Sequence, residues 1–289
     1  MKSCQLLFAS IITVCASGVL AKPLKAPHEV IAQAPEQAWR VVDSNNVLKI
    51  QLPTGATYVE LNPLLAPRHV NNIKLLARDK FYDGLSFYRF EEGFVAQGGD
   101  QSGKKPIKYG KRQLKAELML QSDSPVEITT VDNNDGYAPR TGFVNGFAVG
   151  QSADGKQTWQ VHCTGAVGMS RDNELDSGGT DFYITLTPQR YLDKNTTVFG
   201  RVLSGMEHIQ RLKRQANGTA PFNPIESVSV LSDISKQDKQ RFKVLDTSHP
   251  SFIELVASRK NRPEAWFVAK PNYADVCAIQ VPVKTFTVD

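Results

Sequence analysis

The sequence predicts a mainly β protein: a closed antiparallel β-barrel of about eight strands capped by two helices, with a large loop insertion and a C-terminal extension. Three observations lead to this prediction. Short alternating apolar runs recur along the chain. Only two segments, far apart, have the spacing of amphipathic helices. The composition, 41% hydrophobic and 22% charged over 289 residues, provides enough apolar material for a globular core.

The N-terminus has the layout of a cleavable secretory signal peptide over residues 1–21. Lys2 precedes an apolar run over residues 6–20, and compact residues lead to Ala21. A membrane anchor is the alternative, but the run is shorter than the about 20 apolar residues that span a bilayer. A lipoprotein site at Cys15 is disfavoured because the residue before it is not small. We therefore expect an exported, periplasmic protein without stable membrane insertion, with secretion as the alternative.

Cysteine usage agrees with export. Removal of the signal peptide leaves Cys163 and Cys277 as the two cysteines of the mature chain. Two cysteines in an exported protein predict one disulfide bond. Two buried free thiols are the alternative.

Residues 22–45 contain three prolines and no sustained periodicity, which is typical of a linker or an arm. The main domain is expected over residues 46–232 and begins with a hairpin of strands at residues 47–52 and 58–61. An amphipathic helix follows over residues 66–79, with a proline at its start.

Further strands are expected at residues 86–90, 93–97, 158–163, 182–186 and 198–202. A second helix starts at Ser204, where Glu207 completes a capping box. The polar stretch over about residues 101–157 is interpreted as a loop insertion. Residues 233–289 contain many apolar side chains, so this extension should pack on the barrel and stabilise it without taking part in catalysis.

Three motifs occur in close succession: FYDG at residues 81–84, F-x-R at 87–89 and GFVAQGGD at 93–100. In this order and spacing they resemble the cyclophilins, a family of peptidyl-prolyl cis/trans isomerases. The resemblance extends over about residues 58–212, broken by the insertion, and includes YVELNPLLAPRHVNNIKLLA before the motifs and GMSRD, SGGTDFYI, YLDKNTTVFGRV and GMEHI after them.

The resemblance implies a proline-binding groove and assigns its residues position by position. It makes Arg89 and Gln97 catalytic, and it places in the groove Phe94, Val95, Ser170, Tyr183, Tyr191 and Leu192. The implied partners are unfolded or proline-containing polypeptides. No metal or organic cofactor is required, and a monomer is expected. The net charge of +5 is spread without a basic block, which argues against a nucleic-acid partner.

The chemistry of these residues agrees with the implied activity. The barrier to rotation about a peptide bond, about 18 to 20 kcal/mol, is the lost resonance of the amide. Twisting makes the prolyl nitrogen more basic, so a fixed cationic donor such as Arg89 stabilises the twisted state more than the planar one. Phe94 and the other apolar residues would bury the proline ring, and the amide of Gln97 would orient the peptide backbone.

The sequence also departs from the best-known eukaryotic cyclophilins. Tyr191 stands where they have Trp, Thr196 where they have His, and Asp181 where they have Gln; Ser170 and Arg171 replace Ala and Asn. The proline pocket is therefore expected to be intact, while the subsites for the residues that flank proline are expected to differ.

Two other functions have some support in the sequence. His162 and Ser177 occur in segments that mimic a chymotrypsin-type serine protease, but their order and separation do not suit that triad. A peptide-binding chaperone, or holdase, with little isomerase activity is the stronger alternative, because the insertion and the aromatic C-terminal extension could capture clients.

Overall fold

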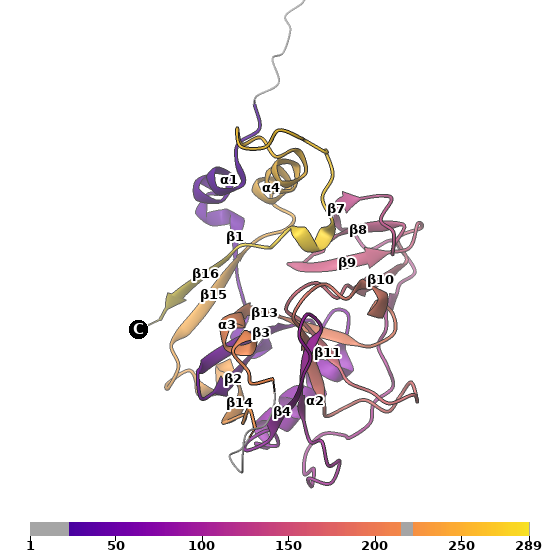
Figure 1. The fold of residues 1–289 in the computed structure, drawn as a ribbon, viewed down its shortest axis with the longest axis vertical. Coiled ribbons are helices and arrows are strands. Elements are labelled where there is room, and N and C mark those ends of the chain that lie inside the picture. Colours follow the sequence, from indigo (N-terminus) through magenta and orange to yellow (C-terminus); the bar gives the residue numbers. More distant parts are fainter. Residues whose placement is uncertain (1–22, 215–221, 289) are drawn as a thin grey trace, which may run out of the picture.

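A computed structural model describes residues 23–214 and 222–288. The predicted signal peptide lies outside the described residues. Within those two ranges, no helix is both long and apolar enough to cross a membrane. The main sheet and its helix α2 form the lower part of the molecule in Figure 1, and two further helices lie at the upper end.

The main sheet contains eight antiparallel strands. Their spatial order is β14 (Ser227–Val230), β2 (Val47–Leu52), β3 (Gly55–Leu61), β13 (Val198–Ser204), β11 (Ala166–Met169), β12 (Phe182–Thr185), β5 (Val95–Gly99) and β4 (Ser86–Phe90). The edge strands β14 and β4 do not form a ladder with each other in the described chain. Only the segment 223–225 hydrogen-bonds to residues 84–87 at this seam. The sheet is thus a curled half-barrel, and the predicted closed barrel is not confirmed.

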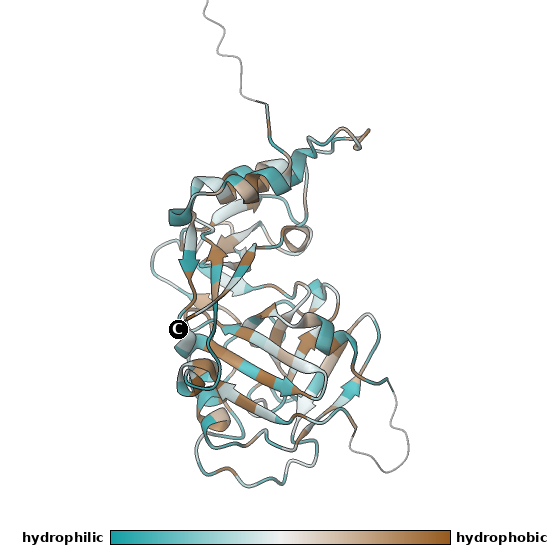
Figure 2. Cartoon of the chain, turned by 90° about the vertical axis from the view of Figure 1, so that its left-hand side faces the viewer, coloured by the Kyte–Doolittle hydropathy of each residue, from teal (hydrophilic) through white to brown (hydrophobic). Residues whose placement is uncertain are grey.

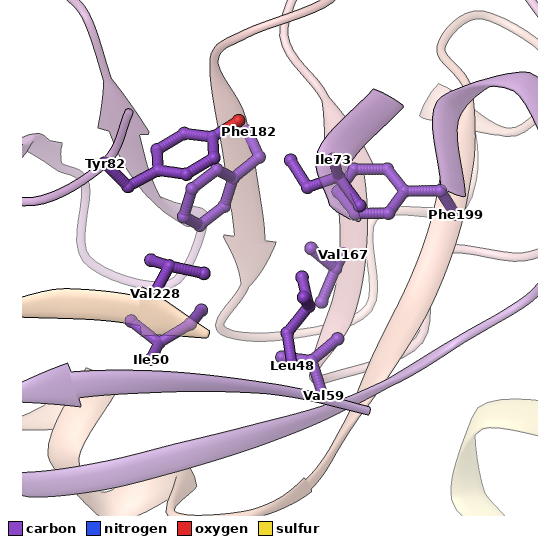
Figure 3. A pocket seen from close by; sticks show the side chains of 9 residues that line it. All are labelled: Leu48, Ile50, Val59, Ile73, Tyr82, Val167, Phe182, Phe199 and Val228. Atoms are coloured by element: carbon purple, nitrogen blue, oxygen red, sulfur yellow. The ribbon is translucent and has the colours of Figure 1, made fainter. Parts of the chain in front are cut away.

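Helix α2 (Pro67–Arg78) packs against the inner face of this sheet. Pro67 occupies its first turn, where a missing N–H costs nothing, and Val70, Ile73 and Leu76 are buried at helical spacing. Figure 3 shows how side chains from α2 and from the strands converge in this core, with Ile73 facing Phe199, Val167 and Leu48. The amphipathic helix expected over residues 66–79 is therefore confirmed.

The second helix, α3 (Met206–Gln210), is present but does not begin as expected. Its N-cap is Gly205 in a left-handed conformation, and no side chain caps the helix. The predicted capping box of Ser204 and Glu207 is wrong, because Ser204 is the last residue of β13 and pairs there with Tyr58.

The insertion is a second sheet and not a loop. Its five antiparallel strands are ordered β6 (Leu120–Gln121), β10 (Gln157–Gln160), β9 (Phe147–Gln151), β8 (Arg140–Val144) and β7 (Thr129–Asp132). The strand expected at residues 158–163 begins here, in β10, and not in the main sheet. The polar and glycine-rich sequence hid these strands because their apolar residues are few and face a core shared with the extension, which includes Phe143 and Trp159.

The N-terminal arm and the C-terminal extension fold together. The arm is not a linker, since it contains α1 (Pro27–Gln33) and β1 (Trp39–Val41); the extension contributes β15 (Gln240–Leu245), α4 (Pro250–Asn261) and β16 (Val283–Thr287). The strands form a third sheet in the order β1, β15, β16, and α1 packs on α4. Short 3-10 turns complete the chain: η1 (Glu36–Ala38), η2 (Ser44–Asn46), η3 (Arg190–Leu192), η4 (Leu231–Ile234) and η5 (Val276–Ala278).

A second apolar core joins this extension to the main sheet. The Tyr58 ring of β3 lies 5.0 Å from the Phe242 ring of β15, and Leu203 of β13 belongs to the same cluster. The structure also contains the predicted disulfide between Cys163 and Cys277, which ties the chain after β10 to η5. The extension is thus attached by packing and by a covalent bond.

Candidate active site

A row of residues runs across four strands on the outer face of the main sheet. Arg89 of β4 lies opposite Gln97 of β5, Gln97 lies opposite Tyr183 of β12, and Tyr183 lies opposite Gly168 of β11. Successive side chains of a strand point to opposite faces. The neighbour of Tyr183, Phe182, lies in the inner core, so Tyr183 and its row face outward.

A bulge in β4 brings two side chains of this strand to the same neighbour. The register shifts between Ser86 and Arg89, and a bulge of this kind redirects side chains. The guanidinium Nη1 of Arg89 donates to Gln97 Oε1 at 3.1 Å, while Gln97 Nε2 donates to the hydroxyl of Tyr88 at 2.7 Å. Both ends of the Gln97 amide are thereby fixed.

Glu91 holds the guanidinium of Arg89 in place. Its Oε1 accepts from Arg89 Nε at 2.8 Å and from Nη2 at 2.6 Å. The Arg89 side chain is 44% exposed, so this ion pair adds little to stability and mainly sets orientation. Three of the five guanidinium N–H groups are engaged by Glu91 and Gln97, which leaves two for a bound peptide.

Two aromatic rings form the apolar wall beside Arg89. The Arg89 Cζ lies 5.6 Å from the centroid of the half-buried Phe94 ring. Phe94 in turn stacks on Tyr191 of η3, with centroids 6.5 Å apart and an interplanar angle of 15°. Leu192 follows in the same turn and is half-buried, while Val95 is buried two residues before Gln97 on the same face of β5.

Tyr183 forms the floor of the row. A Cβ atom at Gly168 would lie 2.3 Å from the Tyr183 ring, so only glycine allows the ring to rest there. Its hydroxyl contacts Nε2 of the fully buried His162 at 2.8 Å and the Thr196 hydroxyl. Burial raises the pKa of Tyr183, so the phenol stays protonated and can donate to one of these two partners.

A buried polar chain continues from His162 beneath the floor. His162 Nδ1 lies 2.9 Å from Asp193 Oδ1, and Asp193 Oδ2 accepts from Arg190 Nε at 2.7 Å. Arg190 also pairs with Asp135 of the inserted segment at 2.9 Å and with Asp275 of the extension at 3.5 Å. The inserted segment and the C-terminal extension therefore each contribute a carboxylate to the polar chain beneath Tyr183.

The buried polar chain beneath Tyr183 was not predicted from the sequence. His162 was considered only as part of a protease-like segment, and no motif includes Asp193 and Arg190 together. The one usable signal was Thr196, which stands where the best-known eukaryotic cyclophilins have His. The structure supplies an imidazole from His162, whose Nε2 lies 3.1 Å from the Thr196 hydroxyl. Glu91 was missed too, although it lies two residues after the catalytic candidate Arg89.

A cavity of about 320 Å³ adjoins Gln97 and is lined by three of the five positions at which the sequence departs from the best-known eukaryotic cyclophilins. Ser170, Arg171 and Asp181 line it together with Gln97 and Tyr88. The hydroxyl of Ser170 is buried and has no hydrogen-bond partner among the described residues, so a bound peptide could satisfy it.

Asp181 orders the wall of this cavity. Its Oδ2 accepts from the Tyr88 hydroxyl at 2.7 Å and its Oδ1 accepts from the backbone N–H of Asp100 at 3.0 Å. A Cβ atom at Gly99 would lie 2.5 Å from Asp181, which explains the second glycine of the QGGD motif. Burial, followed by the bond to Asp181, raises the pKa of Tyr88.

The protease-like residues do not form a catalytic pair. The Ser177 hydroxyl donates to the Glu174 carbonyl at 2.6 Å and accepts from the Asp172 N–H at 2.9 Å. His162 is bonded instead to Asp193, Tyr183 and Thr196. The structure thus agrees with the rejection of this function.

Comparisons with known proteins agree with this geometry. Residues 47–232 match the family described as cyclophilin type peptidyl-prolyl cis-trans isomerase/CLD. A probable peptidyl-prolyl cis-trans isomerase of Brucella suis is 29% identical over 190 residues, 65% of this chain and 83% of that protein. Peptidyl-prolyl cis-trans isomerase ppi1 of Schizosaccharomyces pombe is 27% identical over 188 residues, 64% of this chain and 97% of that protein.

The crystal structure of cyclophilin AquaCyp293 from Hirschia baltica superposes with a TM-score of 0.71 at 29% identity. The match covers 87% of this chain and 94% of that one, which is more than the family segment, so part of the additional structure is shared. The family match, the curled sheet and the row that begins at Arg89 agree: this chain belongs to the cyclophilin-type peptidyl-prolyl cis-trans isomerases.

Proposed function

We propose that this protein accelerates cis/trans isomerisation of X-Pro bonds in exported proteins and so assists their folding. The observation that carries the proposal is the Arg89 guanidinium, fixed by Glu91 and Gln97 beside the Phe94 ring with two N–H groups left over. A proline ring packed on Phe94 would bring its nitrogen next to a preorganised cationic donor.

Some residues of the site contribute mainly to peptide binding, and others contribute mainly to the rate of isomerisation. Phe94 and Tyr191 provide an apolar wall that shields the amide from water. Gln97, held at both ends, orients the peptide backbone. Arg89 donates to the prolyl nitrogen as the amide twists and the nitrogen lone pair becomes available, an interaction stronger in the transition state than in the planar ground state.

The magnitudes suit such a site. Going from an uncatalysed time of about 10 to 100 s to a typical turnover requires roughly 3 to 7 kcal/mol. A charge-assisted hydrogen bond contributes about 1.5 to 3 kcal/mol, and the apolar surroundings strengthen it.

The proposed location is the periplasm, or the outside of the cell. The apolar N-terminal segment and the Cys163–Cys277 disulfide support an oxidising compartment outside the cytosol. The mass of the purified mature protein should correspond to a chain that begins at Lys22.

The function is tested by NMR exchange spectroscopy on a proline-containing peptide, with the mature protein at catalytic concentration. We expect exchange between the cis and trans peptide signals in its presence, and none on this timescale without it. An aggregation-suppression assay on an unfolded protein runs in parallel. Suppression without any exchange would overturn the proposal in favour of the holdase.

Cyclosporin is expected to inhibit this protein weakly. The indole N–H donor of the best-known relatives is replaced by Tyr191, whose ring stacks on Phe94 and whose side chain is 58% exposed. Inhibition of the exchange rate should strengthen in Tyr191→Trp by about tenfold or more, the value of one hydrogen bond of about 1.5 kcal/mol. Nanomolar inhibition of the wild type would contradict this assignment.

A further inference from the structure

The loop between α4 and η5, residues 262–275, exposes large apolar side chains. Trp266 is 82% exposed and Val268 is 101% exposed, the highest values among the large apolar side chains of the described residues. Single exposed apolar residues are ordinary, but two this exposed on one loop are not. Figure 2 shows the loop standing out from the body of the molecule, level with the helices of the upper end.

The loop presents these side chains in a defined arrangement. The Phe267 N–H donates to the Glu264 carbonyl at 3.1 Å and closes a turn. The Phe267 ring lies edge-on to the Trp266 indole, with centroids 4.9 Å apart, and the Arg262 guanidinium lies 5.3 Å from the Phe267 centroid. Trp266 is thereby held outward at the tip.

Basic side chains outnumber carboxylates in this loop and at the end of the helix before it. Residues 259–275 contain four cationic side chains, Arg259, Lys260, Arg262 and Lys270, and two carboxylates, Glu264 and Asp275. In the part of the chain that the structure describes, none of the four forms an ion pair. The end of α4 and the loop together therefore combine an exposed apolar tip with an excess of positive charge.

We propose that this loop binds the surface of an anionic lipid bilayer. Trp266 and Val268 enter the interfacial region, where an amphipathic indole is stable, and Arg262 and Lys270 contact anionic headgroups.

The first residues that the structure describes lie against the helix that precedes the loop. The Ser258 hydroxyl of α4 donates to the Lys25 carbonyl at 2.7 Å, and Lys25 Nζ lies 3.5 Å from Glu254 of the same helix. Residues 23–25 thus rest on the helix from which the loop departs (Figure 1).

Acidic groups limit the contact to the tip. Burial raises the pKa of Tyr273, which lies where the loop returns to the body of the molecule. The nearby carboxylates of Asp275, Asp135 and Asp132 raise this pKa further. Negative headgroups would be repelled there, although Arg190 pairs with two of these carboxylates. The bilayer therefore meets the turn around Trp266 and not the base of the loop.

Tryptophan fluorescence provides a direct test. The chain has three tryptophans; Trp39 and Trp159 are only 6% and 2% exposed, so an environmental change at the surface reports on Trp266. We expect a blue shift when vesicles containing phosphatidylglycerol are added at low salt. Pure phosphatidylcholine vesicles should give little shift, and added salt should reduce the response.

Matched variants locate the contact in a vesicle co-sedimentation assay. Trp266→Ala should lower the partition coefficient by about tenfold or more, since the free energy of burying a large apolar side chain corresponds to at least this factor. The control Tyr109→Ala removes another exposed aromatic ring beside a lysine, Lys108, and should leave binding unchanged. Lys270→Glu should weaken binding, whereas Lys239→Glu, the same charge change on another exposed segment, should weaken it much less.

Equal thermal unfolding of the variants would show that the fold is intact. The proposal is overturned if anionic vesicles leave the Trp266 emission unchanged, or if Trp266→Ala binds them as the wild type does. It is equally overturned if only an unfolded protein, such as reduced carboxymethylated lactalbumin, shifts the emission, because the loop would then be a client-binding surface.

Discussion

Replacing Arg89 with alanine is expected to lower kcat/KM for proline isomerisation by about one to two decades or more. Each decade is about 1.36 kcal/mol, and the lost charge-assisted hydrogen bond is worth about 1.5 to 3 kcal/mol. Peptide affinity should fall much less, because the interaction forms mainly with the twisted amide. NMR exchange and a binding titration on the same peptide measure the two effects separately.

Two further variants sharpen this prediction. Arg89→Lys should not restore the rate, because an ammonium group cannot keep the paired bonds to Glu91 while also reaching the substrate. Arg214→Ala is the matched control: Arg214 is similarly exposed, pairs with Glu92 at 2.8 Å and lies over the Phe90 ring, outside the row. It should leave the rate unchanged.

Phe94→Ala should behave differently from Arg89→Ala, because its ring would hold proline in the ground state and in the transition state alike. Affinity and rate should therefore fall together. Unchanged exchange in a folded Arg89→Ala protein would refute the catalytic assignment and would make the holdase the better interpretation.

Removing the disulfide should have the largest effect on stability. The bond closes a separation of 114 residues, for which chain entropy alone gives up to roughly 4.7 kcal/mol. Because native strain and residual structure reduce such values, we expect the Cys163→Ser, Cys277→Ser double variant to lose about 2 to 4 kcal/mol in urea unfolding. Isomerase activity per folded molecule provides the control for an intact groove.

Alkylation tests the pairing itself. In the denatured but unreduced protein neither thiol should react, and reduction should release both. Two freely reacting thiols under these conditions would contradict the disulfide and would remove the reason for the stability difference.

The motifs made the main sheet and the row from Arg89 to Tyr183 predictable because they fix positions where several physical demands coincide. Gly99 must lack a side chain beside Asp181, and Arg89 must sit opposite Gln97, so a short stretch of sequence specifies local geometry. The inserted sheet has similar steric constraints, such as Gly150 beside the Trp159 indole, but no family motif contains them. Its strands are short and polar, and they pack on a core to which the distant extension contributes Phe252 and Val244.

The polar residues beneath Tyr183 could not be predicted from the sequence for a related reason. His162, Asp193 and Arg190 meet only when distant segments of the chain come together. Taken alone, each residue would fit an ordinary core or surface position equally well. Closure of the barrel failed as a prediction because strand number does not determine whether the edge strands pair. That depends on the segment before β14, where residues 223–225 and not a strand reach β4.

The ion-pair cluster at Arg190 makes it difficult to separate the family segment from the structure added to it. The Arg190 side chain is 5% exposed and faces carboxylates from three parts of the chain: Asp193 of the family segment, Asp135 of the insertion and Asp275 of the extension. A minimal fragment trimmed to the family segment would lose Asp275 and open the cluster to water, and one without the inserted sheet would also lose the bidentate partner Asp135. Removing one partner from a buried ion-pair cluster is destabilising. We therefore expect the added sheets to belong to the smallest piece of this chain that keeps the Tyr183 floor in place.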